Sequence, residues 1–204
     1  MLDQIMKFKA SGCVGKARPQ FSVVLPLIEK DGEWHVLFEK RSAKVLRQPG
    51  DICFPGGEHE PEDEDLLATA KRECCEELGI TAEKVELLAP IDYFINHHHL
   101  LIMAYLGIVH AAEFRIDSRE VEQIFTIPLQ FLLDYQPRIS YYNFQIEMQD
   151  DYPFELIPGG RKYPLEHPRP PQYFYCWEEH VIWGLTATIL TQFLQVLKEE
   201  RNLS

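Results

Sequence analysis

A glycine turn followed by an acidic helix is the feature of this sequence that most restricts its fold. Residues 54–80 read FPGGEHEPEDEDLLATAKRECCEELGI. Apolar residues recur there at steps of three and four and Gly79 follows, so the pattern predicts a helix over Leu66–Leu78 that ends at the glycine. A short strand over Ile52–Phe54 leads into the turn. The fold must therefore bring a strand end, a turn without side chains and a charged helix next to one another.

Three glutamates lie on one side of that predicted helix. Glu73, Glu76 and Glu77 occupy positions i, i+3 and i+4, which are neighbours on a helix surface. Like charges at this spacing repel one another by roughly a few tenths of a kcal/mol per pair. A hard divalent cation such as Mg²⁺ would collect them, since it prefers oxygen ligands. Arg72 is placed to hold Glu76 as an i, i+4 partner. A solvated acidic helix face is the other explanation that the spacing allows.

The remaining elements alternate between strands and helices. The predicted strands are Phe21–Ile28, Trp34–Phe38, Val85–Ile95 and Leu100–Val109, and the predicted helices are Pro128–Tyr135 and Val181–Lys198. Tyr141–Tyr175 is rich in Pro, Tyr and acids, and we expect an elaborated loop or hairpin there. We expect one domain over residues 1–204, with a short N-terminal extension, because about 200 residues fit one core.

Charge and composition exclude several classes of protein. Twenty basic and thirty-two acidic side chains give a net charge of −12, which argues against nucleic acid as a partner. The sequence has no apolar run long enough to cross a bilayer and no secretory leader, so we expect a cytoplasmic protein without a membrane partner. The five cysteines are an odd number without a Cys-x-x-Cys motif, so we expect free thiols.

The glycine turn and the acidic helix together resemble the Nudix box. That pattern is Gly, five residues, Glu, seven residues, then Arg-Glu-aliphatic-x-Glu-Glu-x-Gly-aliphatic. The residues that match are Arg72, Glu73, Glu76, Glu77, Gly79 and Ile80, and Cys74 takes the aliphatic position. The spacing departs from the pattern at one point, since six residues instead of five separate Gly57 from Glu64. This insertion puts the role of Glu64 in doubt.

The residues before the turn resemble the signature of the coenzyme A diphosphatase branch of the Nudix hydrolases. Leu37–Gly57 reads LFEKRSAKVLRQPGDICFPGG. The residues in register are Arg41, Ser42, Gly50, Phe54, Pro55, Gly56 and Gly57. Two positions differ, because Glu39 stands where the signature has threonine, and Leu46 where it has a second arginine, with Arg47 one place later.

The resemblance implies an α/β fold, namely an α/β/α sandwich with a mixed β-sheet. It also implies hydrolysis of a nucleoside diphosphate derivative with Mg²⁺ or Mn²⁺ as the cofactor. Coenzyme A or an acyl-coenzyme A would give 3′,5′-ADP and (acyl-)4′-phosphopantetheine. The implied residues are Glu73, Glu76, Glu77 and Arg72 for catalysis; Glu73, Glu77, Glu76 and the Gly56 carbonyl for metal; Arg41, Arg47, Phe54 and Gly57 for substrate; and Glu120 as an extra carboxylate.

Other interpretations stay open at this point. The substrate of a Nudix hydrolase can also be ADP-ribose, a dinucleotide or a nucleoside triphosphate, and a Nudix domain can sense nucleotides without catalysis. The basic residues around Arg41 and Arg47 suit phosphate contact or a solvated loop edge. His97, His98 and His99 suit a hairpin tip better than a metal site, because neighbouring strand residues point to opposite faces. The segment Tyr141–Tyr175 either covers the substrate or forms a surface hairpin.

Overall fold

The computed structural model describes residues 20–95, 100–144, 146–164 and 169–203 of the chain. The expected hairpin tip at His97–His99 lies outside the described residues. All further statements about the structure refer to the described ranges.

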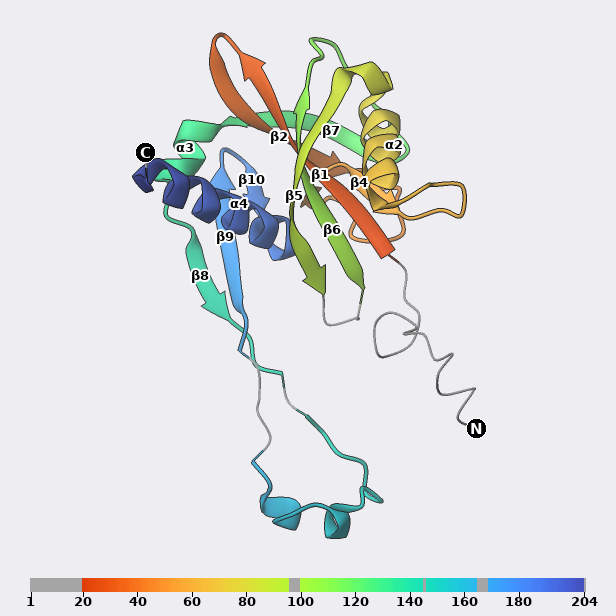
Figure 1. Cartoon of the computed structure of the whole chain (residues 1–204), viewed down its shortest axis with the longest axis vertical. Helices are drawn as coiled ribbons and strands as arrows, with labels where there is room; N and C mark the ends of the chain where they lie inside the picture. Colours follow the sequence, from red (N-terminus) through yellow and green to blue (C-terminus); the bar gives the residue numbers. More distant parts are fainter. Residues whose placement is uncertain (1–19, 96–99, 145, 165–168, 204) are drawn as a thin grey trace, which may run out of the picture.

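A mixed β-sheet lies at the centre of the structure (Figure 1). Its strands are β1 (Gln20–Lys30), β2 (Glu33–Arg41), β3 (Ile52–Cys53), β4 (Gly56–Glu58), β5 (Val85–Ile95), β6 (Leu101–Val109) and β7 (Val121–Pro128). The order is β3-β2-β1-β6-β5, with β4 paired to β1 and β7 paired to β2. The pairing of β1 with β6 is parallel, and the other pairs are antiparallel. The sheet is therefore mixed, as the resemblance implies.

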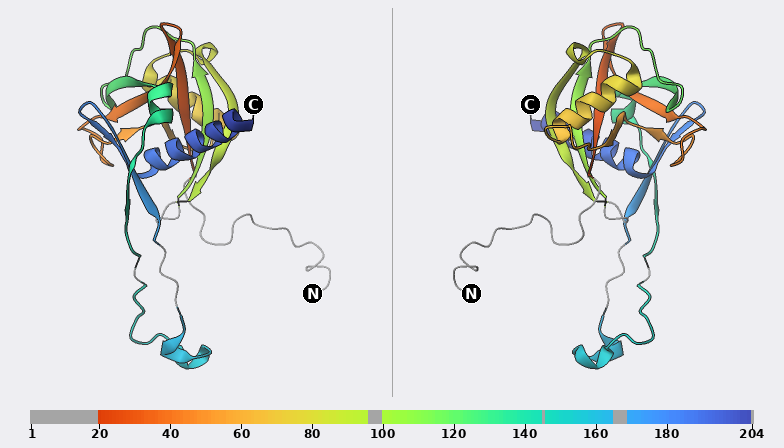
Figure 2. Two further views of the ribbon diagram at one scale, coloured as in Figure 1. Left: turned by 90° about the vertical axis from the view of Figure 1, so that its left-hand side faces the viewer. Right: turned by 90° about the vertical axis from the view of Figure 1, so that its right-hand side faces the viewer.

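Helices cover both faces of this sheet, because its strands carry apolar side chains on both sides. On β2, Leu37 packs into the cluster that contains Cys74 and Leu78 of helix α2 (Leu66–Leu78). The alternate residue Phe38 packs into the opposite cluster, together with residues of helix α4 (Gly184–Leu203). Figure 2 shows α2 and α4 on opposite faces of the sheet. The expected α/β/α sandwich is confirmed.

A second, three-stranded sheet contains β8 (Arg138–Tyr141), β9 (Pro171–Trp177) and β10 (His180–Ile182). Between β8 and β9 the chain projects away from the sandwich as an arm that carries two short 3-10 turns, Phe154–Leu156 and Gly160–Lys162 (Figures 1 and 2). We call the described residues of this segment, 142–144, 146–164 and 169–170, the arm. Its position favours the surface hairpin over a substrate cover.

The rings of the arm contact other groups of the arm. Tyr142 meets Phe144 with 5.1 Å between ring centroids, and Tyr152 meets Phe154 at 4.9 Å. The Arg161 guanidinium lies over the Phe154 ring, 4.6 Å from its centroid. These ring contacts lie within the arm, whereas Tyr173 and Tyr175, at the end of the Tyr141–Tyr175 segment, pack against the core of the sandwich.

The predicted elements recur with shifted ends. The helix expected at Pro128–Tyr135 is α3 (Leu129–Asp134). The helix expected from Val181 begins instead at Gly184, because Val181 lies within β10. Strand β7, whose Ile124 and Phe125 pair with β2, was not predicted.

Two expectations about the chain as a whole can be compared with the described ranges. Within them, no helix is both long and apolar enough to cross a membrane. The cysteines described there, at positions 53, 74, 75 and 176, are free thiols, as expected.

Candidate active site

The glycine turn and helix α2 meet at a backbone hydrogen bond. The Gly56 N–H donates to Oε2 of Glu77 over 2.8 Å, and this carboxylate is only 5% exposed. The turn is itself fixed to the sheet, because the Val24 N–H donates to the Pro55 carbonyl at 2.9 Å and β4 pairs with β1. The carboxylate of Glu77 thus has a defined orientation before any ligand binds.

Gly57 leaves the space that Glu73 occupies. A Cβ atom at position 57 would lie 2.3 Å from the carboxyl carbon of Glu73. A side chain there would displace this carboxylate, which explains why the second residue of the turn is a glycine. Glu73 and Glu77 therefore lie against the turn, as the sequence predicts.

The third glutamate does not share this burial. Glu76 has a side chain that is 61% exposed and lies at the outer edge of the helix. The spacing of three and four residues brings the glutamates to one side of α2, but only two of them face the glycine turn.

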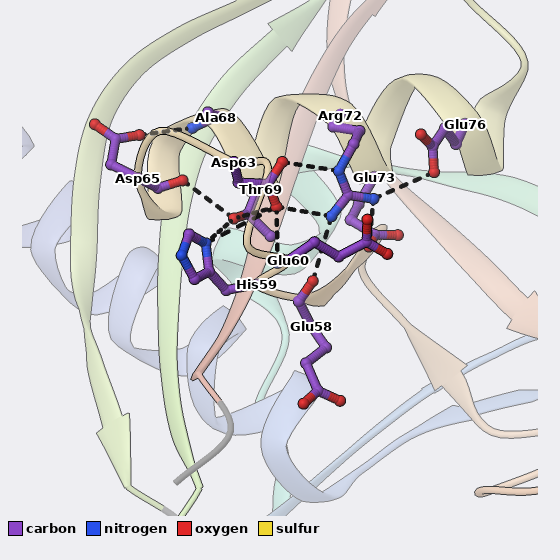
Figure 3. Close-up of polar contacts among 10 residues, drawn as sticks. All are labelled: Glu58, His59, Glu60, Asp63, Asp65, Ala68, Thr69, Arg72, Glu73 and Glu76. Carbon is purple, nitrogen blue, oxygen red and sulfur yellow. Dashed lines mark hydrogen bonds and ion pairs between the residues drawn. The ribbon is translucent and has the colours of Figure 1, made fainter. Parts of the chain in front are cut away.

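Arg72 joins the helix to the acidic loop before it (Figure 3). Its Nε and Nη2 donate to Oδ1 and Oδ2 of Asp63, both at 2.9 Å, and the Asp63 side chain is 6% exposed. Its Nη1 donates to Oε1 of Glu73 at 2.8 Å and to Oε2 of Glu76 at 3.3 Å. The expected pair of Arg72 with Glu76 is confirmed, but it is the longest of these contacts to carboxylates. The sequence analysis missed Asp63, which is nine residues from Arg72.

A buried carboxyl that the sequence analysis did not assign to the site lies beside Glu77. Glu39 on β2 is 0% exposed, and neither of its side-chain oxygens has a hydrogen-bond partner that meets standard geometry. Burial and the neighbouring Glu77 raise the pKa of Glu39 well above its ordinary value, and burial raises the pKa of Glu77 to about 7. A glutamate directly after the apolar run Val36–Phe38 was the signal that could have identified this residue.

The predicted substrate residues Arg41 and Arg47 lie at the end of β2 and in the loop that follows it. Nε of Arg41 donates to the Arg47 carbonyl at 3.2 Å, and the Arg47 side chain is exposed. Glu120 has an exposed side chain and lies on a neighbouring loop. Its backbone carbonyl accepts a hydrogen bond from the Ser42 N–H at 2.8 Å. Its charge is the smallest of the influences that raise the pKa of Glu73 and of Glu39, which indicates that it lies in their neighbourhood.

Phe54 has a different position from the one predicted. It is 3% exposed, and its ring stacks on Phe38 in the core with 5.1 Å between centroids. We therefore assign Phe54 to core packing and not to substrate contact, because a ring enclosed in this way is out of reach of a ligand.

A hollow of about 560 Å³ lies on the other face of β2. Its lining includes Lys40, Gln123, Phe174, His180 and Trp183. Residues alternate along a strand, so Lys40 points away from the face that carries Glu39. The hollow is thus separated from the carboxylates by the sheet.

The acidic side chains fit a hard divalent cation by their chemistry. They offer oxygen ligands only, and the buried Glu39 and Glu77 are adjacent carboxyls of the same sign. Within the described ranges no three His, Cys, Asp or Glu side chains already form a cation site. Arg72 holds one oxygen of Glu73 and one oxygen of Glu76 in ion pairs.

Comparison with known families and proteins gives one consistent assignment. The family described as "NUDIX domain" matches residues 18–143. A mouse protein named "Peroxisomal coenzyme A diphosphatase NUDT7" is 35% identical over 128 residues, which are 62% of this chain and 53% of that protein. A human protein named "Mitochondrial coenzyme A diphosphatase NUDT8" is 32% identical over 187 residues, 89% of this chain and 71% of that protein.

A bacterial relative and a solved structure agree with this assignment. "Uncharacterized Nudix hydrolase NudL" of Photorhabdus laumondii is 30% identical over 175 residues, 85% of this chain and 82% of that protein. The crystal structure of a MutT/nudix family protein from Enterococcus faecalis superposes with a TM-score of 0.56 at 12% identity, covering 97% of this chain and 68% of that one. At this identity the structural similarity shows the fold alone.

Proposed function

The chain belongs to the Nudix hydrolase family of enzymes, and from this premise we propose that it hydrolyses the diphosphate bond of coenzyme A or an acyl-coenzyme A. Water adds to one phosphorus atom and the bridging P–O bond breaks. The products are 3′,5′-ADP and (acyl-)4′-phosphopantetheine. Two of the relatives carry the name coenzyme A diphosphatase, and residues 37–57 resemble the signature of that branch.

The observation that carries the proposal is the contact between the glycine turn and Glu77. The Glu77 carboxylate is buried and held at one oxygen by the Gly56 N–H, and Glu73 packs against Gly57, which supports the proposal because two carboxylates lie at one fixed turn. We assign Glu73 and Glu77 as first ligands of Mg²⁺ or Mn²⁺, with Glu76 and the Gly56 carbonyl next. A bound divalent cation would neutralise the diphosphate and lower the pKa of the attacking water.

The chain's own residues position these ligands. Arg72 holds the Glu73 carboxylate through Nη1 while Asp63 fixes the guanidinium from the other side. Arg41 ends β2 and Arg47 lies in the loop after it, and we assign both to the phosphates of the substrate. Glu120 remains the proposed extra carboxylate.

Two alternatives belong to the same fold. Another nucleoside diphosphate derivative or a nucleoside triphosphate is a possible substrate, because Glu39 and Leu46 depart from the coenzyme A signature. A nucleotide sensor without catalysis is disfavoured, since Glu73, Glu76 and Glu77 are all present. A cytoplasmic location also stays a prediction, because the names of the mouse and human relatives specify peroxisomes and mitochondria.

The test compares turnover of the wild-type protein with that of Glu77→Gln. Purified protein with MgCl₂ or MnCl₂ is assayed on coenzyme A, 3′-dephospho-coenzyme A, ADP-ribose, a dinucleotide and ATP, and the products are identified by chromatography. We expect the wild type to release 3′,5′-ADP from coenzyme A, and a chelator to abolish the reaction. Glu77→Gln should lose at least about 100-fold in kcat, because loss of a direct ligand should cost more than loss of its supporting partners. Its thermal midpoint should change little, since the amide oxygen can still accept from Gly56.

Glu86→Gln is the matched control. Glu86 is an exposed strand glutamate on β5 that pairs with His110, so the same chemical change there should leave kcat unaltered. Turnover by Glu77→Gln at the wild-type rate, or in excess chelator, contradicts the cation site. Release of product only from ADP-ribose, a dinucleotide or ATP contradicts the substrate.

A further inference from the structure

Among the described residues, the glutamate Glu39 in the β-sheet has no ion-pair partner, and this needs a reason. Glu39 is completely buried on β2, and neither carboxyl oxygen accepts or donates a hydrogen bond of standard geometry. Buried carboxyls are normally hydrogen-bonded, paired with a cation or bound to a metal ion, because removing them from water is costly. The position of Glu39 in the sheet indicates which of these partners it has.

The register of β2 directs Glu39 toward α2. Leu37, two residues earlier, packs against the buried face of α2, and side chains two apart on a strand share a face. The strongest charge acting on Glu39 is that of Glu77, the carboxylate held by the Gly56 N–H. Glu39 therefore approaches the glycine turn from the sheet, while Glu73 and Glu77 approach it from the helix.

The two basic residues that follow Glu39 in the sequence each have another contact. Lys40 points to the opposite face and pairs with Glu122 at 2.6 Å. Arg41 is the cation that acts on Glu39, but its Nε donates to the Arg47 carbonyl. The other groups that act on Glu39 are acids, namely Glu77 and Glu120. Within the described ranges, the carboxyls of Glu39 and Glu77 thus lie together without a side-chain cation in contact with Glu39.

We propose that Glu39 is a further ligand of the divalent cation, supplied by the sheet and absent from the helix motif. The proposal rests on the proposed function, since it concerns the same cation site. A bound Mg²⁺ or Mn²⁺ would supply a direct positive contact to Glu39 and Glu77, on which Arg41 acts without an ion pair among the described residues. The competing explanation is structural, in which the two carboxyls share a proton and Glu39 has no part in binding the cation.

Cation binding without substrate separates these two explanations. Mn²⁺ is titrated into the full-length wild type, Glu39→Gln and the control Glu86→Gln, with calorimetry and electron paramagnetic resonance of free Mn²⁺ as readouts. Thermal midpoints are measured with and without Mn²⁺. We expect Glu39→Gln to weaken Mn²⁺ binding by about tenfold or more and to reduce the rise in midpoint that Mn²⁺ causes. Its midpoint without Mn²⁺ should equal or exceed that of the wild type, because the amide has nearly the same shape and carries no charge.

Mn²⁺ affinity in Glu39→Gln equal to that of the wild type overturns the proposal, and so does a variant that only melts earlier without any change in Mn²⁺ affinity. Glu39→Asp is a second probe, should the amide fail to fold. This variant keeps the negative charge but shortens the side chain by one methylene group. If Glu39 is a ligand, Glu39→Asp must also bind Mn²⁺ more weakly than the wild type. An affinity equal to that of the wild type overturns the proposal.

The same experiment separates this proposal from the proposed function. A wild type that cleaves coenzyme A, with an unchanged Mn²⁺ affinity in Glu39→Gln, removes the role of Glu39 alone. A wild type that binds Mn²⁺ through Glu39 but cleaves none of the tested substrates removes the substrate assignment alone. A wild type that binds no Mn²⁺ removes both.

Discussion

Arg72 has a larger role in the structure than its position in the helix suggests. A helix rule applied to the sequence pairs it with the residue four positions later, Glu76. The structure gives it two further acidic partners, Glu73 and the nearly buried Asp63, and the Asp63 contact uses both oxygens of the carboxylate. Bidentate pairs of this kind are stronger and more directional than single contacts. The guanidinium is thus a fixed point between the loop and the helix.

Asp63→Asn should lower the stability of the fold at neutral pH. It should also make that stability fall less steeply as the pH becomes acidic. Hydrogen bonds from Arg72 hold the pKa of Asp63 well below its usual value of 3.8. A carboxyl whose pKa is lower in the folded than in the unfolded protein stabilises the fold at pH values above its unfolded-state pKa. This stabilisation is lost as the pH falls toward its folded-state pKa. The thermal midpoint of the variant should lie below that of the wild type at pH 7. The difference should shrink below about pH 4.

Asp117→Asn is the control for this prediction. Asp117 also has a lowered pKa, at about 2, because of Arg119, but the Arg119 side chain is largely exposed. Exposed ion pairs contribute little, so this variant should melt close to the wild type at pH 7. A midpoint for Asp63→Asn that matches the wild type at pH 7 would mean that the loop is not fixed by Arg72.

At the scale of elements, the glycine turn has two contacts of different kinds. A Cβ at position 56 would meet backbone atoms of β1, namely the Ser22 carbonyl at 2.3 Å and Cα of Val23 at 2.6 Å. A Cβ at position 57 would meet the end of a flexible side chain, the carboxyl group of Glu73. The two glycines therefore serve different purposes, the first in folding and the second in placing a ligand.

Gly57→Ala should keep the fold and reduce turnover. The new methyl group must push the Glu73 carboxylate away from its contact with Arg72, and a displacement of this size at a reacting centre can cost about 100-fold in rate. Gly56→Ala should instead lower the thermal midpoint or prevent folding, because β1 backbone cannot move aside. The measurements are cation-dependent kcat and thermal melting of both variants. Full activity of Gly57→Ala would show that Glu73 is not needed where it stands.

The sequence predicted this element well for a physical reason. Helix periodicity and the final Gly79 are local signals, and they placed α2 at Leu66–Leu78 as observed. Asp63 gave no local signal, and Glu39 gave only a weak one, a charged residue directly after the apolar run Val36–Phe38, because the importance of both comes from neighbours distant in the sequence. Phe54 was misassigned for the same reason, because a motif identifies a residue type but not whether its ring faces ligand or core.

At the scale of the whole molecule, the sandwich and the arm have separate sets of contacts. The end of β8 pairs with the start of β9 through Tyr141 and Pro171. Residues between them leave the sandwich, and several apolar side chains there are exposed, among them Ile146, Leu156 and Tyr163. Composition alone predicted a loop or hairpin here, but not its direction, because direction depends on where β8 and β9 enter the second sheet.

Replacing residues 142–170 with a short Gly-Ser connector should leave the enzyme intact. Tyr141 and Pro171 are paired neighbours, so a tight turn can join them, and the ring contacts that are lost lie within the arm. We expect an unchanged thermal midpoint and an unchanged KM. Trp177→Ala serves as the positive control, because this ring packs on Phe131 with 4.5 Å between centroids and its loss should lower the midpoint. A raised KM in the shortened protein would instead assign substrate contact to the arm.

The parallel pairing of β1 with β6 has a consequence for the time course of folding. Ser22 and Met103 are partners across 81 positions of sequence, and β1 also carries the glycine turn through Val23 and Gly56. Contacts of such long range form late, because the chain must close a large loop before the pairing returns any free energy. Helix α2 can begin to form from its local sequence, whereas its carboxylates reach their final positions only when β1 is fixed between its neighbours. During synthesis, the carboxylate site is therefore completed after β6 has left the ribosome.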